Sequence, residues 1–509
     1  MNAGRPGPAD SRLGIADMLL LIIFMIGIYT GYTIQISARI PFPSAPSGVA
    51  GLLLLWRRRD DIQPAQFGAL LFVILLYVGS ILSATDIAHL GKRFTGLVQV
   101  TYSLVISYAL FLTVVRANRN QIAHLFLGFC LVILIGCLLE DYAGLRPISD
   151  AFRHAVYKAL NVYDADLRDE ILYGRIRPKL FTSEPSAVTF AYTLFGFAWL
   201  MTTRTRLAPL KYLVLMALGI VVMPGPTLLL MIPLLIPYQL LRARSWSPAF
   251  FRMILVLIFA MVALVAFDIL GHSVFSERMR DITQGNDASF FYRVTGPALV
   301  ARNVMLHFPF AGAGLTGETF IANEVANVYM RSAAFSSAWD ISDTASVLTN
   351  YFWLHWIYLG LVWGTIVLLG LTLWLKLLGV PSVPFCWMVW AVLGQASGAY
   401  VGPKTWTVLL LSGACAILAD RDAVRTTLFP AVPYPRPYLR SDKRRRPAPV
   451  LPQPQWRRRG ARNGVRAPRI VRDRCSLRAG RSGASGGGCA AEPGAECGRF
   501  RRRRRRPHR

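Results

Sequence analysis

The chain has 509 residues, of which 54% are hydrophobic, and its mean hydropathy of +0.42 excludes an ordinary soluble protein. Several apolar runs of roughly 20 residues predict a polytopic membrane protein instead. The net charge is +29, yet the segment from Arg421 onward holds 26 Lys and Arg against 5 Asp and Glu, which leaves only about +8 elsewhere. Nucleic acid is therefore excluded as a partner of the apolar body, and we expect none for the chain.

About twelve membrane-spanning helices are predicted along the chain. The first apolar run is too long for the core of a signal peptide, so we expect an uncleaved first span. Two prolines at Met223–Pro226 predict the end of one helix and the start of the next. The expected spans are Ile15–Ile34, Ile40–Trp56, Ala65–Ala84, Gly96–Val115, Ile122–Leu139, Ser186–Met201, Pro209–Met223, Pro226–Leu241, Met253–Leu270, Leu361–Leu378, Val383–Tyr400 and Trp406–Leu418.

Basic residues occur in alternate loops of this scheme, and this alternation predicts an orientation. The positive-inside rule puts those loops and both chain termini on the cytoplasmic side. The loops carry Arg57, Arg116, Arg204, Arg242, Lys376 and the basic tail. Two long polar segments, Glu140 to Ser186 and Gly271 to Asn350, then both fall outside.

These two outer segments are too long for plain connectors, because structureless loops beyond about 12–15 residues usually carry function. We predict that they meet on one side of the membrane and form the working site. In the first, SDAFRHAVYKALNVYDADL starts with Ser149 as an N-cap and predicts one amphipathic helix with an apolar face from Phe152 to Leu167. In the second, TFIANEVANVYM predicts another helix, with Phe320, Ile321, Val325 and Tyr329 on its apolar face.

The end of the chain differs from the rest, so we divide the sequence into a membrane domain, residues 1–420, and a tail, residues 421–509. From Pro430 the tail is rich in Pro, Arg and Gly and lacks apolar periodicity, so we expect disorder. Its arginines could contact anionic lipids, at about 1 kcal/mol per basic residue near the surface. We favour the simpler alternative, a dispensable extension.

Basic residues at the edges of apolar runs are the candidates for binding an anion. Arg293 follows ASFFY and begins a predicted helix. A guanidinium held there suits a diphosphate, because its planar fork donates two parallel hydrogen bonds. Further positive charge comes from Arg175, Arg177 and Lys179 at the end of the first segment, and from Arg302 in the second. The alternative is that these side chains are solvated or pair with loop carboxylates.

Glu184 stands at the threshold of an apolar helix in FTSEPSAVTF. An acid followed by Pro185 is equally typical of a plain helix start. The functional interpretation places Glu184 beside an acceptor sugar or beside an arginine that it orients.

Gly312 and Gly314 lie in FPFAGAGLTG, which lacks the Lys-Ser/Thr continuation of a nucleotide-binding loop. They indicate a turn or a close approach of two backbones. His307 could act as a base, but a structural role is more typical of its setting. His355, within YFWLHWIY, indicates an aromatic interface belt.

Several of these features together resemble one family. They are RIRPKLFTSEPS leading into a span, the large outer segment with Arg293 and PFAGAG, and YLGLVWG at Tyr358–Gly364. From about Ile15 to Leu418 the chain resembles the bacterial O-antigen ligase and O-antigen or exopolysaccharide polymerase family, whereas the tail has no counterpart. The resemblance implies an all-α fold of the GT-C type in the bacterial inner membrane.

Members of that family use an undecaprenyl-diphosphate-linked glycan as donor and invert the anomeric centre without a nucleotide sugar, metal or other cofactor. The resemblance implies that Arg293, with Arg177 and Arg175, holds the donor diphosphate and stabilises it as it departs. We accordingly expect Arg293 and Glu184 to be catalytic. The expected substrate-binding residues are Arg175, Arg177, Lys179, Arg302, Gly312 and Gly314.

Ligase members carry a histidine base late in the large segment, where this chain has DISDTASVLTNYFW, with Asp343, Ser346 and Asn350. The missing histidine favours a polymerase of lipid-linked repeat units over a ligase and leaves the base unidentified. Besides the lipid-linked substrate and the membrane, a chain-length regulator of polysaccharide assembly is an expected partner. Two further alternatives are a polysaccharide transporter or flippase, which would carry ionisable residues within its spans, and a non-catalytic assembly protein.

Overall fold

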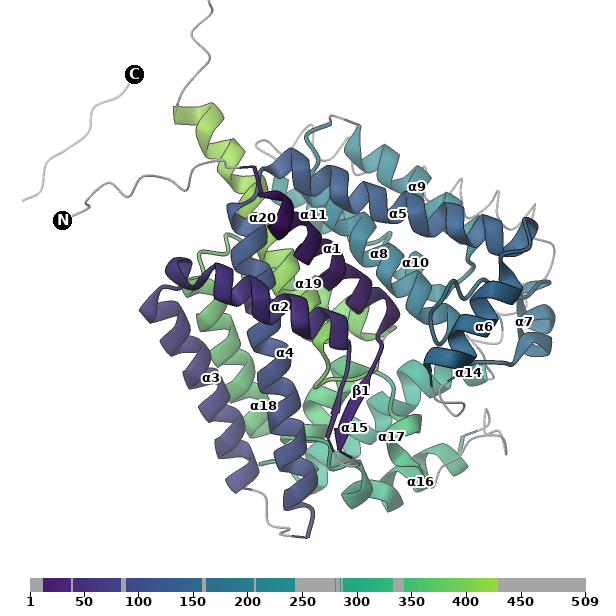
Figure 1. Ribbon diagram of the computed structural model, residues 1–509. Helices are drawn as coiled ribbons and strands as arrows, with labels where there is room; N and C mark the ends of the chain where they lie inside the picture. The colour runs from purple at the N-terminus through teal and green to yellow at the C-terminus, as the bar shows by residue number, and fades with distance from the viewer. Residues whose placement is uncertain are drawn as a thin grey trace, which may run out of the picture. The chain divides into compact units, whose positions relative to one another are not determined.

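The computed structural model describes residues 12–37, 40–83, 88–157, 162–205, 207–242, 280, 284, 287–332, 343–396 and 398–428. The chain divides into two units, Met1–Tyr434 and Pro435–Arg509, and every described residue belongs to the first. This unit is predominantly helical, as predicted (Figure 1). The expected span Met253–Leu270 lies outside the described residues.

Most apolar runs of the described chain form a helix, but the expected span Pro226–Leu241 is divided into two short helices, Pro226–Leu230 and Leu235–Arg242. In the first half the helices are α1 (Ile15–Thr30), α2 (Ala45–Arg57), α3 (Pro64–Leu82), α4 (Leu90–Arg116), α5 (Arg119–Tyr142), α6 (Arg146–Val156), α7 (Asp166–Tyr173), α8 (Pro185–Thr202), α9 (Ala208–Val222), α10 (Pro226–Leu230) and α11 (Leu235–Arg242). The second half contains α14 (Ala288–Phe290), α15 (Gly296–His307), α16 (Ala322–Met330), α17 (Thr344–Val347), α18 (Tyr351–Leu377), α19 (Val383–Gly394) and α20 (Pro403–Leu428). The predicted break at Met223–Pro226 is confirmed, since α9 ends before it and α10 begins at its last proline.

Four helices of the described chain are long and apolar enough to cross a membrane: α3, α4, α5 and α18. The described chain is therefore compatible with a helical membrane protein, while the number of about twelve spans and the orientation stay predictions. The fold is not entirely α-helical, because strands β1 (Ile34–Ser37) and β2 (Ile40–Phe42) form an antiparallel pair between α1 and α2.

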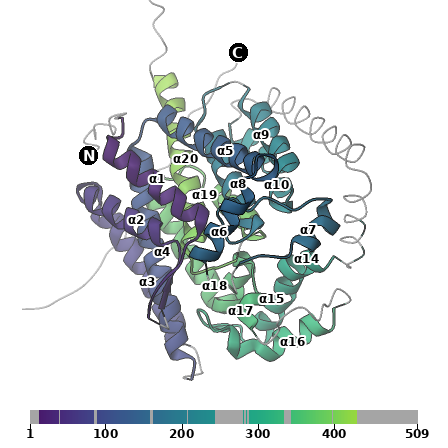
Figure 2. The same ribbon diagram turned by 45° about the vertical axis from the view of Figure 1, so that its right-hand side comes forward.

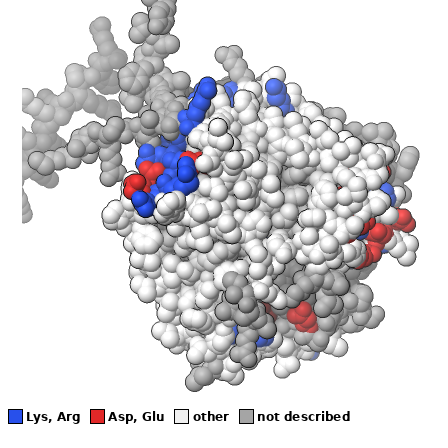
Figure 3. Space-filling model, viewed as in Figure 1, with Lys and Arg blue, Asp and Glu red and all other residues white. Residues whose placement is uncertain are grey.

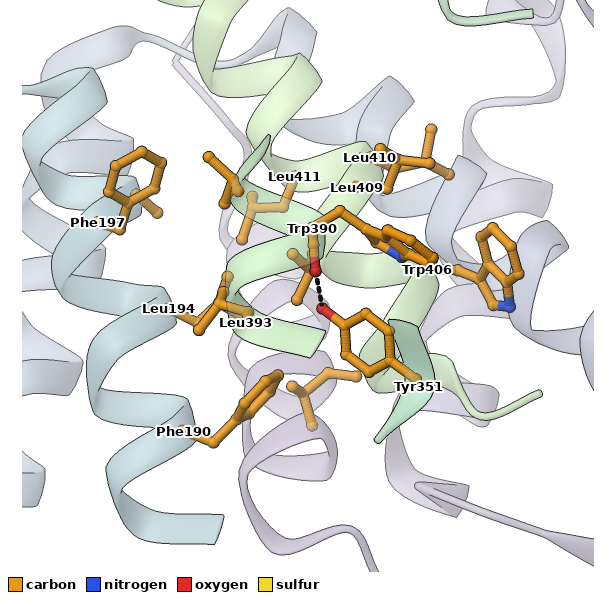
Figure 4. Close-up of a cluster of buried hydrophobic side chains, with 14 of the residues drawn as sticks. Phe190, Leu194, Phe197, Tyr351, Trp390, Leu393, Trp406, Leu409, Leu410 and Leu411 are labelled. Atoms are coloured by element: carbon orange, nitrogen blue, oxygen red, sulfur yellow. Dashed lines mark hydrogen bonds between the residues drawn. The ribbon is translucent and has the colours of Figure 1, made fainter. Parts of the chain in front are cut away.

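The core joins α8, α19 and α20 through large apolar side chains (Figure 4). Phe190 and Leu194 of α8 face Leu393 of α19, and all three side chains are buried. Tyr351, the first residue of α18, donates a hydrogen bond of 2.8 Å to the carbonyl of Trp390. These contacts hold the start of α18 and the first half of α8 near the C-terminal end of α19.

Two of the basic loops predicted to share one side of the membrane, those at Arg57 and Arg116, lie together. Asp17, in the first turn of α1, forms ion pairs with Arg57 and Arg58 at the end of α2. Arg116, at the end of α4, pairs with Asp61 at 2.7 Å. A charged patch over this end of the helices is visible at the upper left of Figure 3. We call this the basic end.

The first outer segment lies at the other end of the same helices. The hydroxyl of Tyr29, near the end of α1, donates to the carbonyl of Leu180 at 2.7 Å. The hydroxyl of Tyr157 donates to the carbonyl of Thr30 at 2.9 Å. Figures 1 and 2 both show α14, from the second segment, beside α7 of the first. We call this the loop end.

The single amphipathic helix predicted from Ser149 to Leu167 is wrong. α6 begins earlier, at Arg146, and ends at Val156, and α7 is a separate helix. The buried residues of α6 are polar, Ser149 and Arg153, whereas Phe152 is 40% exposed. The predicted face of the second outer helix is confirmed for Val325 and Tyr329, which are buried in α16, whereas Phe320 and Ile321 precede that helix in a 3₁₀ turn, Glu318–Ile321.

Candidate functional site

The glycine turn of the second outer segment fills a break in α18. Gly360 has a φ of 64° and a ψ of −170°, so the helix is interrupted there. A break within an apolar span frees backbone groups that lipid cannot satisfy. The N–H of Val362 therefore donates to the carbonyl of Pro309 at 2.9 Å, and the N–H of Ala313 donates to the carbonyl of Ile357 at 2.8 Å.

Gly312 and Gly314 allow this close approach, which confirms the prediction made for them. A Cβ at Gly312 would lie 2.3 Å from the carbonyl oxygen of Ile357, and one at Gly314 would lie 2.3 Å from Nε of Arg93. The N–H groups of both glycines already donate to backbone carbonyls. Backbone packing thus accounts for both residues, and a contact with substrate stays a prediction.

Two of the predicted cations of the first segment are paired with carboxylates. The guanidinium of Arg177 donates two bonds to Asp169, at 3.0 and 2.7 Å, and lies 4.5 Å from the centre of the Tyr173 ring. The ammonium of Lys179 bonds Asp166 at 2.7 Å. Charges neutralised in this way hold the segment together and attract an added diphosphate only weakly.

Arg175 is paired in a looser arrangement. Its guanidinium lies 3.9 Å from a carboxylate oxygen of Asp141 and also donates to the carbonyl of Val221. Arg175, Arg177 and Lys179 therefore follow the alternative given for them, in which these side chains pair with loop carboxylates.

Two residues that build the loop end were not singled out from the sequence. Arg153 is fully buried and donates to the carbonyls of Thr182 and Tyr163, at 2.8 and 2.7 Å. Glu140, also buried, accepts from the N–H groups of Lys179 and Leu180, at 3.0 and 2.6 Å. Arg153 and Glu140 thus satisfy backbone groups of Tyr163, Lys179, Leu180 and Thr182, and these bonds position the chain that leads to Glu184, the N-cap of α8.

Arg293 differs from the cations of the first segment. It lies in a π-helical turn, Phe291–Thr295, that leads into α15, and its side chain is half-buried. Within the described chain, no residue hydrogen-bonds or ion-pairs with its guanidinium. Its backbone is held in place, since the side-chain amide of Asn350 donates to the carbonyl of Arg293 at 2.9 Å.

Glu184 is the N-cap residue of α8, but its side chain does not cap the helix. The helix-start alternative is therefore incomplete, because the usual hydrogen bond of a capping carboxylate is missing. Glu184 lies near Lys404, whose ammonium it stabilises. Burial lowers the pKa of Lys404, and the carboxylate of Glu184 opposes this effect.

Lys404 is a further candidate that sequence reasoning missed. Its ammonium lies 5.9 Å from the centre of the Phe190 ring, and a Cβ at Gly31 would lie 3.2 Å from it. Lys404 therefore stands where α8 and α20 begin and α1 ends. Among the described residues, none bonds directly to its ammonium. A single lysine in GPKTW before an apolar run gave no sequence signal.

The surroundings of Arg293 and Lys404 are linked through the turn between α19 and α20. The amide of Asn350 that bonds Arg293 also donates to the side-chain oxygen of Gln395 at 2.9 Å, at the end of α19. Thr405, next to Lys404, donates to the carbonyl of Ala399 at 2.8 Å in the same turn. The loop end thus carries two cations and one carboxylate whose side chains form no direct hydrogen bond or ion pair within the described chain.

The other candidates lie apart from this group. Arg302 and His307 are exposed on α15. His355 is buried, not part of an interface belt as predicted, because its ring nitrogens bond the hydroxyl of Tyr400 and the carbonyl of Gly364, at 2.9 and 3.0 Å. The side chain of Ser346 lies outside the described residues.

One further carboxylate is buried in the second segment. The hydroxyl of Tyr358 donates to the carboxylate of Glu318. Burial raises the pKa of Glu318, and the bond from Tyr358 opposes this effect. Across the described ranges, no group of three His, Cys, Asp or Glu residues could hold a metal ion.

Comparison with models of known protein families finds no match, and comparison with curated protein sequences finds none either. The chemistry of the site is therefore argued from its own residues. Each half-buried cation, the guanidinium of Arg293 and the ammonium of Lys404, can bind phosphate oxygens, and the carboxylate of Glu184 near Lys404 can accept a proton from a sugar hydroxyl.

Proposed function

We propose that the protein polymerises lipid-linked oligosaccharide repeat units at the outer face of a bacterial inner membrane. The observation that carries the proposal is the guanidinium of Arg293, which is half-buried at the loop end and has no partner within the described chain. A partly buried cation without a counter-ion favours an anionic ligand. The resemblance to the O-antigen polymerase and ligase family supplies the ligand, an undecaprenyl diphosphate.

In the proposed reaction, Arg293 and Lys404 hold the diphosphate of the donor. A hydroxyl oxygen of the acceptor sugar attacks the anomeric carbon, and the bond from that carbon to the phosphate oxygen breaks. The diphosphate leaves with the electron pair, and the two cations stabilise its added charge. We assign Glu184 as the carboxylate that accepts the proton of the attacking hydroxyl, since it lies near Lys404 and its side chain caps no backbone group.

The roles of the other expected substrate-binding residues differ in this proposal. Arg175, Arg177 and Lys179 act by holding the first outer segment in shape, because their charges pair with its carboxylates. Arg302 is exposed and is a candidate for contact with the glycan rather than with the diphosphate. Gly312 and Gly314 hold the second segment against α18.

The test is the glycan profile of a strain that lacks the gene and is complemented with wild type, Arg293→Ala or Arg331→Ala. Arg331 is an exposed arginine of the same segment and serves as the matched control. We expect long chains with wild type and with Arg331→Ala, and accumulated lipid-linked single repeats with Arg293→Ala. Wild-type chain lengths with Arg293→Ala would overturn the diphosphate assignment.

The same profile separates the alternatives. A complete polymer that stays unattached to its lipid acceptor in the deletion strain would identify a ligase. Repeats confined to the cytoplasmic face would identify a flippase or transporter. Chains of normal length but reduced amount in every variant would identify an assembly protein without catalytic function.

A further inference from the structure

A groove of about 500 Å³ opens at the basic end, between α5, α8 and α9. Two of the residues that line it are basic and exposed, Arg204 and Lys211, and none of its described lining residues is acidic. Asn120 and Thr203 add hydrogen-bonding groups between them. The groove therefore concentrates positive charge beside polar side chains.

One wall of the groove is fixed by a buried arginine. Arg119 is 4% exposed, and its guanidinium donates to the carbonyls of Thr202 and Thr203, at 2.7 and 3.0 Å. The end of α8 is thereby fastened to the start of α5. Because the wall is held by hydrogen bonds within the fold, the groove is a built feature rather than a gap between mobile loops.

The groove continues into an apolar track. Leu127, which also lines it, lies two helical turns beyond Asn120 on α5, about 10 Å along the axis. Farther along the same helix, Leu131 and Ile135 are exposed, and on the facing helix α9 Leu218 is exposed as well. A ligand with an anionic headgroup and apolar tails fits this arrangement, in which a basic groove lies next to exposed apolar faces of two helices.

We propose that the groove binds the phosphate headgroup of an anionic phospholipid, with its acyl chains along the exposed faces of α5 and α9. A guanidinium and an ammonium at the end of membrane helices are the groups that recognise such headgroups. Soluble phosphate shares the headgroup chemistry but does not use the apolar track, so we commit to the lipid. No residue of this site belongs to the glycan-transfer site at the loop end.

The test is native mass spectrometry of the purified full-length protein with phosphatidylglycerol or phosphatidylcholine added. We expect preferential retention of phosphatidylglycerol by wild type. Arg204→Gln/Lys211→Gln is expected to weaken it on the order of 30-fold, from about 1 kcal/mol for each basic residue. The matched control is Arg59→Gln/Lys376→Gln, which removes two exposed charges outside the groove and is expected to bind as wild type.

A single variant and a competition with inorganic phosphate distinguish lipid binding from the alternatives. Lys211→Gln alone removes an exposed side chain without a described partner, so it is expected to preserve the fold and to weaken binding about fivefold. Equal losses in the groove variant and the control would overturn the proposal in favour of diffuse surface charge. Displacement of phosphatidylglycerol by millimolar inorganic phosphate would overturn it in favour of a soluble ligand.

Discussion

Asn350 holds the backbone of Arg293 in place: its side-chain amide donates to the carbonyl of Arg293 at 2.9 Å, and the same amide donates to Gln395. The oxygen of that side chain meanwhile caps α18 by accepting from the N–H groups of Phe352 and Trp353. One buried asparagine therefore connects the starts of α15 and α18 with the end of α19.

Asn350→Asp tests this positioning role, because aspartate retains the capping oxygen and loses both donated bonds. We expect turnover to fall on the order of tenfold to a hundredfold, since small displacements of a reacting group are costly. The measurement is polymer synthesis from lipid-linked repeats with purified protein, separated into kcat and KM. If the unfolding midpoint falls while kcat is unchanged, Asn350 is structural only.

Lys404 predicts an alkaline limit to activity. Burial lowers the pKa of its ammonium, so the folded protein loses this charge at a lower pH than an exposed lysine would. Diphosphate binding is then complete below that pKa and falls as the pH rises through it. Lys404→Arg is expected to keep the charge and shift the alkaline fall of kcat/KM to higher pH. Lys376→Arg, at the opposite end of the helices, is the control, and an identical shift there would refute the assignment.

The pair Arg177–Asp169 predicts a stability effect. Their side chains are 11% and 0% exposed. Because removal of one partner leaves a buried charge unpaired, Asp169→Asn is expected to cost about 3–5 kcal/mol of unfolding free energy. The double variant Arg177→Met/Asp169→Leu is expected to recover most of it. The structural role of this pair is contradicted if Arg177→Ala loses turnover while its unfolding midpoint is unchanged. That result would indicate that Arg177 binds substrate.

Gly314→Ala tests the contact between the glycine turn and the rest of the fold. The φ of Gly314 is 79°, and an added Cβ would lie 2.3 Å from Nε of the buried Arg93. The backbone cost is about 1–2 kcal/mol, and the clash adds about 1–3 kcal/mol. Gly379→Ala is the control, because its φ of 81° carries the same backbone cost and no atom lies within 4 Å. Equal unfolding midpoints for the two variants would show that the side chain of Arg93 moves away from the added Cβ without a cost in stability.

Much of the fold could be predicted from the sequence because apolar runs and prolines act locally. The apolar runs located most of the long apolar helices that the structure describes, and the glycines in FPFAGAGLTG indicated the close backbone approach. The pairing of Arg177 with Asp169 could not be predicted, because several loop carboxylates were available and only the folded segment selects one. Lys404 was missed for a related reason. Its surroundings come from α1, α8 and α20, which are far apart in the sequence.

The face of α6 was mispredicted for an instructive reason. A prediction from apolar periodicity rests on the assumption that a helix buries the face that carries its apolar side chains. In α6, Arg153 turns inward because the carbonyls of Thr182 and Tyr163 need donors where the chain approaches α8. In α6, the hydrogen bonds that Arg153 donates to backbone carbonyls outside the helix outweigh the apolar pattern of the helix itself.

The break at Gly360 has a consequence for engineering. The chain from Phe308 to Gly314 supplies hydrogen-bond partners to the interrupted helix α18 and receives partners from it. In a chimaera that exchanges the second outer segment alone, the foreign segment would pack against α18. The break of α18 at Gly360 is matched to the backbone of the native segment and not to that of the foreign one. Substrate specificity should therefore be transplanted as a cassette that runs from Gly296 through the end of α18, and a swap confined to the segment should yield misfolded protein.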